Sequence, residues 1–373
     1  WTRMAEMHIS SYWKHQFSKI LDYLTRQKKP AVVLMTVGGT ILGGQKVLNF
    51  VLTGKFSWGS LTVGTNDGNF ISDYIVPIVA IILIVMGGIL MVLNEYLAFK
   101  QNSHKRIILV AGNGLRTTSE TGLDKKVTSI LKGTIYPVDI DITQQYRDGY
   151  VFEPELTFIR KILPSKDNLA QLLAKGSAES IQVGYGGFLP VPFTFFIGNV
   201  LDDKSNVSVF DWDRENERWE HISEKHIDDG ESFISETIRT GELDEIVLVV
   251  SCSYRVKMPQ VGECFKGLGI EHLTLETIAF DNHWSLVKQR RLSIQFAEKI
   301  KSLSDMGIRT IHLILAAQSS VVLNLGRRYD SRNMSELIVY QYEQTNKNPY
   351  PWGIYALSHG HENGGFIPRS EEQ

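Results

Sequence analysis

Hydroxyl, amide and glycine residues follow four apolar runs of this sequence, and their chemistry suits an anionic ligand. The four groups are Gly112-Asn113-Gly114, Gly184-Tyr185-Gly186-Gly187 with Pro190, Ser251-Cys252-Ser253-Tyr254, and Gln318-Ser319-Ser320. The first N–H groups of a helix are unpaired, and its dipole favours negative charge there. Ser319 and Ser320 fit such an anion site best, although a serine before a helix often serves only as its N-cap.

Each polar group follows a short apolar run that is typical of a buried parallel strand. The runs Arg106–Gly112 and Glu245–Ser251 share one pattern, while Ser180–Gly184 and Thr310–Ala316 form a second pair at a similar interval. Parallel sheets bind ligands beyond the carboxyl ends of their strands. We therefore expect the polar groups to gather around one ligand.

Further features recur at nearly the same interval and indicate an internal duplication. Gly198 and Gly326 follow the second strand of each pair, and the predicted strands Val207–Phe210 and Leu337–Tyr340 come next in each copy. Apolar residues at helical spacing predict a crossover helix over Ser285–Asp305. The predicted fold class is α/β, with two doubly wound, Rossmann-type halves.

Two apolar stretches precede this part and predict a transmembrane hairpin over residues 30–99. Tyr74–Asn94 has 21 residues and no charged side chain, so a helix of about 30 Å can cross a bilayer. Pro30–Gly54 contains one charge, Lys46. Gly39 and Gly43 form a small-xxx-small pair, which allows helices to approach closely in lipid.

The first predicted span also carries a polar stripe. Gln45, Asn49 and Thr53 recur every four residues, with Lys46 beside them. In one interpretation Lys46 extends to the headgroups and the stripe aids helix packing. In the other, the stripe lines a water-filled path once several copies assemble. The residues predicted for membrane association or a pore are Gly39, Gly43, Gln45, Lys46 and Asn49.

The distribution of basic residues predicts the orientation of the hairpin. Residues 1–29 contain six Lys and Arg, whereas the loop from Phe56 to Asp73 contains none. Positively charged flanks stay in the cytoplasm, so both termini are predicted there, with two spans in a bacterial inner membrane. Residues 1–29 are expected to form an amphipathic juxtamembrane helix, lying either on the membrane or on the soluble part.

Composition excludes several function classes. The chain has 39 Lys and Arg against 41 Asp and Glu, so it lacks the basic surplus of a DNA or RNA duplex binder. Cys252 and Cys264 are its two cysteines, too few for a disulfide framework or a zinc site and consistent with a reducing cytoplasm. No Gly-x-Ser-x-Gly elbow or Walker lysine loop occurs. We therefore predict a binding protein rather than an enzyme.

Other polar motifs have structural interpretations. Gly112-Asn113-Gly114 lacks the full dinucleotide motif, because Thr117 stands where its third glycine would be. His359-Gly360-His361-Glu362 could ligate a metal, but residues 358–373 are rich in glycine and polar residues and predict a flexible tail, with no metal. Asp228 with Asp229 is expected to form a solvated turn rather than an acid–base site, and Asp211 with Asp213 and Arg214 to stabilise a turn between strands. Lys288, Arg290 and Arg291 could either reach phosphates or face water.

The duplicated part resembles a known family. His312 to Arg327, followed by Ile338–Tyr342 and Tyr350–Trp352, resembles the end of a SAVED domain, the sensor module of bacterial CBASS anti-phage systems. Ile197-Gly198, Phe210–Arg214 and Trp219 also resemble it. The resemblance covers roughly residues 106–357 and implies two fused CARF-like halves, about 106–240 and 241–357. The family usually has a proline near the position of Gln318, which is a departure in that loop.

The resemblance implies a ligand and an output. SAVED domains bind cyclic oligonucleotides made by a partner nucleotidyltransferase, a CD-NTase. The chain is therefore expected to be a CBASS effector that binds a cyclic trinucleotide rather than a dinucleotide, forms homo-oligomers and disrupts the membrane lipid; no other cofactor is expected. Phosphates would meet Asn113, Ser251, Ser253, Ser319 and Ser320, and bases would stack on Tyr254, Phe193 or Tyr185, with Gly114, Pro190 and Gln318 in the adjoining loops.

Two alternatives remain open at this point. The first is a membrane-tethered nuclease that degrades cyclic oligonucleotides, which requires a catalytic residue in the ligand site. The second is a scaffold in which the hairpin serves only as an anchor.

Overall fold

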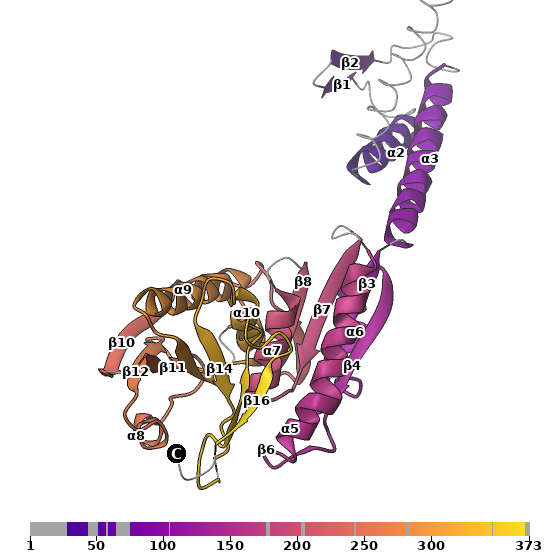
Figure 1. The fold of residues 1–373 in the computed structure, drawn as a ribbon. Coiled ribbons are helices and arrows are strands. Elements are labelled where there is room, and N and C mark those ends of the chain that lie inside the picture. Colours follow the sequence, from indigo (N-terminus) through magenta and orange to yellow (C-terminus); the bar gives the residue numbers. More distant parts are fainter. Residues whose placement is uncertain are drawn as a thin grey trace, which may run out of the picture. The chain divides into compact units, whose positions relative to one another are not determined.

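The chain forms two compact units, residues 1–103 and residues 104–373, in this computed structural model (Figure 1). The residues that the structure describes are 28–43, 51–56, 59–64, 75–103, 105–176, 180–202, 206–241, 244–280, 283–344 and 346–369. The predicted amphipathic helix of residues 1–29 lies almost wholly outside them.

The first unit contains two apolar helices and a small antiparallel pair of strands. Helix α2 spans Lys28–Gly43 and helix α3 spans Val76–Ser103; strand β1, Val51–Phe56, pairs with β2, Gly59–Gly64. Within α3, Val76–Leu97 is long and apolar enough to cross a membrane, whereas Pro30–Leu42 in α2 is a shorter apolar helix. The second predicted helix is therefore confirmed and continues to Ser103.

The first predicted span is shorter than expected. Helix α2 ends at Gly43, and residues 51–56 form β1, so one continuous helix over residues 30–54 is wrong. Glycines weaken a helix, and the Val51-Leu52-Thr53 run favours a strand. Thr53 consequently leaves the predicted helical stripe, while Gln45, Lys46 and Asn49 lie outside the described residues.

Small residues set the contact between α2 and α3. A Cβ atom at Gly38 would lie 2.7 Å from the carbonyl oxygen of Ala80, and one at Gly87 would lie 2.8 Å from that of Ala31. These two reciprocal contacts are possible only because glycine has no side chain. Gly39 faces away from this contact, with open space where its Cβ would be. Gly38 thus allows α2 to contact α3 closely, whereas Gly39 lies on a face of α2 that does not contact α3.

The second unit contains two larger sheets. A five-stranded sheet has the order β4-β3-β7-β8-β9, and a seven-stranded sheet has the order β10-β12-β11-β13-β14-β15-β16. The strands of the first are β3 Arg106–Asn113, β4 Thr134–Asp141, β7 Ile181–Gly187, β8 Val207–Asp213 and β9 Arg218–His221. Those of the second are β10 Ile234–Arg239, β11 Glu245–Ser251, β12 Gly269–Thr274, β13 Thr310–Ala316, β14 Glu336–Tyr340, β15 Trp352–Tyr355 and β16 Gly365–Pro368. A short pair, β5 Tyr146–Arg147 and β6 Tyr150–Val151, lies apart.

The two sheets repeat one topology. In each half four parallel strands are followed by one antiparallel strand, in the order β4-β3-β7-β8-β9 and again β12-β11-β13-β14-β15. The duplication expected from the strand spacing is thus present in the fold. The second sheet adds β10 and β16 at its edges. Strand β10 ends at Arg239, before the predicted boundary at residues 240/241, yet it belongs to the sheet of the second half.

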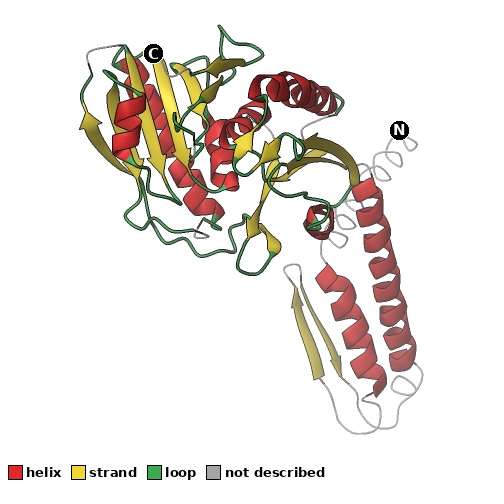
Figure 2. Cartoon of the chain, turned by 90° about the horizontal axis from the view of Figure 1, so that it is seen from below, coloured by secondary structure: helices red, strands yellow, loops and turns green. Residues whose placement is uncertain are grey.

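Helices cover both faces of each sheet (Figure 2). After the first strand of each half comes α4, Leu123–Ile130, or α8, Met258–Cys264. The long crossover contains α5 Pro154–Thr157, the π-helix η2 Phe158–Ile162 and α6 Leu163–Ala174 in one half, and α9 Leu286–Asp305 in the other. The crossover helix predicted over Ser285–Asp305 is confirmed, and the Ser285 hydroxyl accepts a hydrogen bond from the Lys288 N–H at 3.3 Å as its N-cap.

Two helices join the halves at the centre of the unit. Helix α7, Val191–Leu201, and helix α10, Ser319–Arg328, pack against each other between the two sheets (Figure 1). A Cβ atom at Gly198 would collide with the carbonyl oxygen of Leu323, and one at Gly326 with that of Phe195. The relation is reciprocal, so the two glycines that recur in the sequence mark one pseudo-twofold helix crossing.

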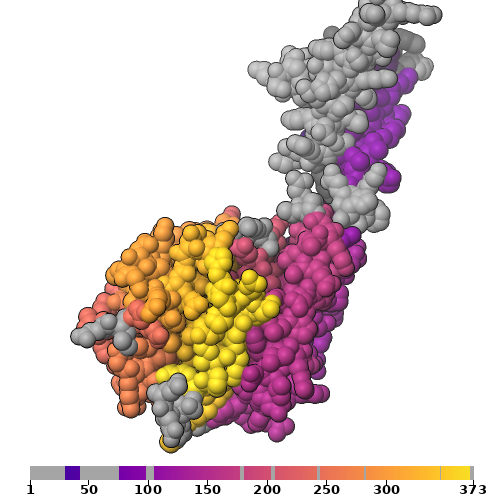
Figure 3. Space-filling model, viewed as in Figure 1, coloured from indigo at the N-terminus to yellow at the C-terminus, as the bar shows by residue number. Residues whose placement is uncertain are grey.

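The C-terminal segment is part of the fold. The sequence predicts a flexible tail over residues 358–373, but Gly365–Pro368 forms β16 and pairs with β15. Phe366 stacks on Trp352 with ring centroids 6.0 Å apart, and the Arg369 guanidinium lies 3.8 Å from the centre of the Phe265 ring. The tail therefore has apolar anchors that its polar composition conceals. Figure 3 shows this segment in yellow between the first half in magenta and the second half in orange.

Candidate ligand site at the strand ends

The carboxyl ends of strands from both halves meet. The N–H groups of Cys252 and Ser253, after β11, donate to the carbonyl oxygen of Ala316 at the end of β13, at 3.0 and 2.9 Å. From the other half, Asp211 on β8 accepts a hydrogen bond from the Ser320 N–H at 2.8 Å. The folding of two duplicated halves onto each other thus brings these strand ends into one place.

The N-terminus of α10 is capped by this carboxylate. Asp211 is 6% exposed, and burial raises the pKa of its carboxyl, although hydrogen bonds from Ser320 and Trp212 partly oppose the shift. A negative charge at a helix N-terminus is stabilising, which is the role predicted for a ligand phosphate there. The Ser320 N–H is therefore used within the protein, and its position does not support the direct ligand contact predicted for Ser320.

The side chain of Ser320 belongs to a buried polar network. Its hydroxyl accepts a hydrogen bond from the Gln289 side-chain amide at 2.9 Å, and Gln289 accepts one from Asn324 at 2.6 Å. Gln289 also donates to the carbonyl oxygen of His283 at 2.5 Å. A satisfied buried network of this kind fixes the positions of α9 and α10 relative to each other.

Several buried polar atoms around this network have no hydrogen-bond partner among the described residues. They are Ser253 Oγ and His283 Nδ1, while the Tyr185 hydroxyl and Ser319 Oγ have no partner beyond each other and Thr194. The Tyr185 hydroxyl lies beside the side chains of Thr194 and Ser319, and burial raises its pKa to about 12. Buried polar groups of folded proteins are normally paired, so a cluster of unpaired ones at the strand ends is a candidate ligand site.

Two of the three aromatic residues expected to stack on bases are in the core. Phe193 is fully buried between Phe158 and Trp352, with ring centroids 6.3 and 5.4 Å away. Tyr185 is also fully buried, so its ring cannot receive a base and its hydroxyl alone reaches the site. The positions of Phe193 and Tyr185 therefore do not support the predicted base stacking, because strand β7 and helix α7 hold both rings in the core. Tyr254 is 41% exposed.

The first polar group has a structural role. The Asn113 side-chain oxygen accepts a hydrogen bond from the Thr118 N–H at 2.6 Å, which closes the turn after β3. Gly114 is buried, and a Cβ atom there would lie 2.5 Å from the carbonyl oxygen of Phe188.

Pro190 is the N-cap of α7 and Gln318 the N-cap of α10. Each precedes the central helix of its own half, so the two N-caps occupy equivalent positions.

Ser251 takes part in an internal hydrogen bond instead of facing the strand ends. Its hydroxyl is fully buried and lies 2.9 Å from His272 Nε2, and His272 Nδ1 lies 3.8 Å from Glu236. Side chains alternate along a strand, so Ser251 points to the same face as Val249, which packs against α8. Burial also lowers the pKa of His272. The direct ligand contact predicted for Ser251 is thus not supported by its position.

The cations of α9 bind acidic residues of the preceding loop. Lys288 is 1% exposed and forms ion pairs with Asp229 and with Glu231, the latter at 2.9 Å. Arg291 holds Asp228 through two hydrogen bonds of 2.6 and 2.7 Å, which lower the pKa of that carboxyl to about 2. Lys288 and Arg291 therefore fix the loop to α9 through ion pairs. The sequence interpretations, in which these side chains reach ligand phosphates or face water, do not describe these contacts. Sequence patterns do not reveal this pairing, because the partners are far apart in the chain.

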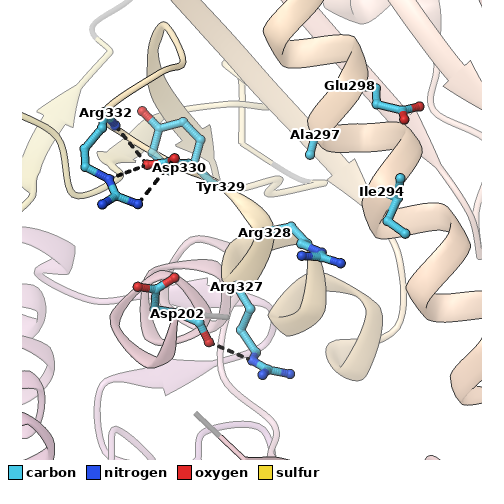
Figure 4. A pocket seen from close by; sticks show the side chains of 9 residues that line it. All are labelled: Asp202, Ile294, Ala297, Glu298, Arg327, Arg328, Tyr329, Asp330 and Arg332. Carbon is cyan, nitrogen blue, oxygen red and sulfur yellow. Dashed lines mark hydrogen bonds and ion pairs between the residues drawn. The ribbon is translucent and has the colours of Figure 1, made fainter. Parts of the chain in front are cut away.

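A separate pocket of about 370 Å³ lies at the C-terminal end of α10 (Figure 4). Its lining includes Arg327, which donates to the backbone of Asp202 at 3.2 Å, and Arg332, which pairs with Asp330 at 3.0 Å. The pocket is at the opposite end of α10 from Ser319.

Among the described residues no group of three or more His, Cys, Asp or Glu could hold a metal ion. His361, in the motif considered for a metal, stacks on Tyr355.

Comparison with known families identifies two domains along the chain. Residues 165–355 match the SAVED family, described as the SMODS-associated and fused to various effectors sensor domain. Residues 11–158 match Saf_2TM, the SAVED-fused 2TM effector domain. The chain belongs to the SAVED family. The SAVED match covers just over half of the chain, and it confirms the family and the α/β fold predicted from the sequence. This SAVED protein thus joins a sensor to a two-helix effector, of which the described residues contain one helix of span length.

Similar solved structures include Cap4 SAVED/CARF-domain containing receptors. Acinetobacter baumannii Cap4 with the cyclic trinucleotide 3′3′3′-cAAA is 12% identical, with 66% of this chain and 50% of that chain covered and a TM-score of 0.44. The same receptor with 2′3′3′-cAAA is 12% identical, with 84% and 57% covered and a TM-score of 0.43. Moraxella osloensis Cap4 is 12% identical, with 70% and 48% covered and a TM-score of 0.37. The matches span about half the length of these receptors. No curated protein matches the chain.

Proposed function

We propose that this SAVED protein is a membrane-anchored CBASS effector whose sensor binds a cyclic oligonucleotide at the joined strand ends. The observation that carries the proposal is the cluster of buried hydroxyl groups of Ser253, Ser319 and Tyr185 at the strand ends. These atoms lie where strands of both halves of a sensor-family domain meet. Hydroxyl groups there can donate to the phosphates of a cyclic ligand, which supplies the missing acceptors.

Contacts between the halves give the ligand a way to act. Asp211 of the first half caps α10 of the second, and the Arg214 guanidinium lies 3.3 Å from the Tyr254 hydroxyl. A ligand at these strand ends touches both halves, so it favours one arrangement of the halves over others. A cyclic trinucleotide, which is larger than a dinucleotide, suits a site that draws on two sheets.

The proposed output is at the bacterial inner membrane, with two spans and both termini in the cytoplasm. Ligand binding promotes homo-oligomers, which gather the apolar hairpins of several copies and disrupt the membrane. The outer face of α2 that bears Gly39 supports this step, because small residues permit close helix contact in lipid. Gly43, Gln45, Lys46 and Asn49 are proposed to take part in this association, although Gln45, Lys46 and Asn49 lie outside the described residues.

Calorimetry of the full chain in nanodiscs against a panel of cyclic di- and trinucleotides tests the binding function. We expect heat with at least one cyclic trinucleotide. Replacing Ser253 and Ser319 together by alanine is expected to weaken binding at least ~10-fold, since a hydrogen bond to a charged group contributes about 1.5–3 kcal/mol. Ser129→Ala, at an exposed serine of α4, is the matched control. No heat with any ligand would contradict the proposal and leave a plain scaffold.

The alternative of a cyclic oligonucleotide nuclease has one observation in its favour, the arrangement of Ser251, His272 and Glu236. A serine activated by a histidine is a nucleophile when substrate can reach it. Ser251 is fully buried, so we expect no cleavage. Chromatography after incubating the protein with 3′3′3′-cAAA distinguishes the two, because a linear product that disappears in His272→Ala would establish the nuclease.

A further inference from the structure

An exposed aromatic pair stands beside the strand ends. Tyr254 follows β11 and is 41% exposed, and Phe280 follows β12 and is 57% exposed. Their ring centroids are 4.5 Å apart with an interplanar angle of 76°. Two large rings that remain exposed while they contact each other form an apolar surface that lacks a partner within the described part of the chain, and such surfaces mark binding sites.

The surroundings of the pair are suited to a nucleotide. Arg214, from the turn after β8 in the other half, is exposed and places its guanidinium 3.3 Å from the Tyr254 hydroxyl. Ser253, next to Tyr254 in the chain, carries one of the unpaired buried hydroxyls. A ring surface and a cation are therefore in contact, and a hydroxyl donor lies on the preceding residue of the chain. Aromatic rings and basic side chains are the groups that stack on bases and bind the phosphate backbone.

We propose that Tyr254 and Phe280, with Arg214 beside them, form an open stacking surface for one nucleobase of the ligand. This inference rests on the proposed function and names the part of the site that holds a base. An edge-to-face pair leaves the outer face of a ring free to stack, and purines gain more from stacking because their ring area is larger. The ligand is accordingly a cyclic oligonucleotide with at least one purine.

The duplication places the two rings of this surface in the second half. Tyr254 stands as far after Glu245, the first residue of β11, as Leu115 stands after Arg106, the first residue of β3. Leu115 is therefore the equivalent position, and it is 63% exposed but has no ring on which a base can stack. The two halves accordingly contact the ligand differently, and the rings that stack on the purine belong to the second half.

The test uses the full chain in nanodiscs and 3′3′3′-cAAA with one adenine replaced by 2-aminopurine, whose fluorescence falls on stacking. The double variant Tyr254→Leu, Phe280→Leu is expected to bind ~5- to 150-fold more weakly, the equivalent of about 1–3 kcal/mol per stacked base. It is also expected to lose the fluorescence decrease. Tyr254→Phe retains the ring and should keep the decrease. Phe152→Leu is the matched control, because Phe152 is 54% exposed and follows β6.

The outcomes separate this inference from the function on which it rests. Wild-type binding that the double variant retains with unchanged affinity and unchanged quenching overturns the stacking surface and leaves the cyclic oligonucleotide sensor in place. Failure of the wild-type chain to bind the probe and every member of the nucleotide panel overturns both.

Discussion

His283 is the histidine whose ionisation the fold controls most strongly among the described residues. It is fully buried, and burial together with the positive charge of Lys288 lowers its pKa to about 4. Its Nε2 lies 3.4 Å from the carbonyl oxygen of Cys252, while the carboxylates of Asp229 and Glu231 oppose the shift. The histidine is therefore neutral in the fold at pH 7.

This lowered pKa predicts acid sensitivity. The folded protein binds a proton at His283 less readily than the unfolded chain, so stability is full above pH ~6.5 and falls as the pH drops toward 4. His283→Gln should remove roughly 1–3 kcal/mol of the difference in unfolding free energy between pH 7 and pH 4.5. Thermal unfolding of both proteins across this range measures the effect. Identical pH slopes would show that His283 does not contribute.

Residue types near the site could be predicted from the sequence, but their orientation could not. Ser253, Ser319 and Tyr254 lie at the strand ends as expected, because parallel strands place their carboxyl ends together. The local pattern around Asp211 predicts a turn, yet this residue caps a helix of the other half. Phe193 points into the core, not toward a ligand. Such orientations depend on the packing of the two halves, which no local pattern encodes.

At the scale of elements, the crossing of α7 and α10 joins the halves. Gly326→Ala should destabilise the protein by about 1–3 kcal/mol, because its Cβ would collide with the backbone of Phe195 and neither helix can move away from the core. Gly262→Ala is the matched control in α8, where the nearest atom is 3.6 Å away. Alanine there should be neutral or slightly stabilising. Chemical unfolding measures both variants, and equal effects would contradict the proposed role of the crossing.

The order of elements was predictable because each half repeats one pattern of strand, crossover and glycine-bearing helix. The nearly constant interval between the two copies of each feature is enough to pair the equivalent strands. The ends of the chain's elements were less predictable. Helix α2 ends at Gly43 because its glycines weaken the helix and the next apolar run favours a strand, whereas β16 forms in a polar segment because it pairs with β15.

At the scale of the whole molecule, the chain combines a helix long enough to cross a membrane with a duplicated α/β unit, residues 104–373, which contains the SAVED match. Apolar length and charge predicted the first part, and internal repetition predicted the second. Anchoring alone does not require a small residue on an outer face of α2, such as Gly39. The proposed association of hairpins in the membrane does require one. The central claim is that occupancy of the strand ends changes the state of the membrane segment.

Dye release from liposomes tests this claim most directly. Vesicles loaded with a quenched dye and carrying the full chain are mixed with the cyclic trinucleotide that calorimetry selects, with the double variant of Tyr254 and Phe280 as the control. We predict rapid release with the wild-type chain, none without ligand, and release from the variant only at higher ligand concentration. Vesicles that stay sealed while the wild-type sensor is saturated with ligand would contradict the account.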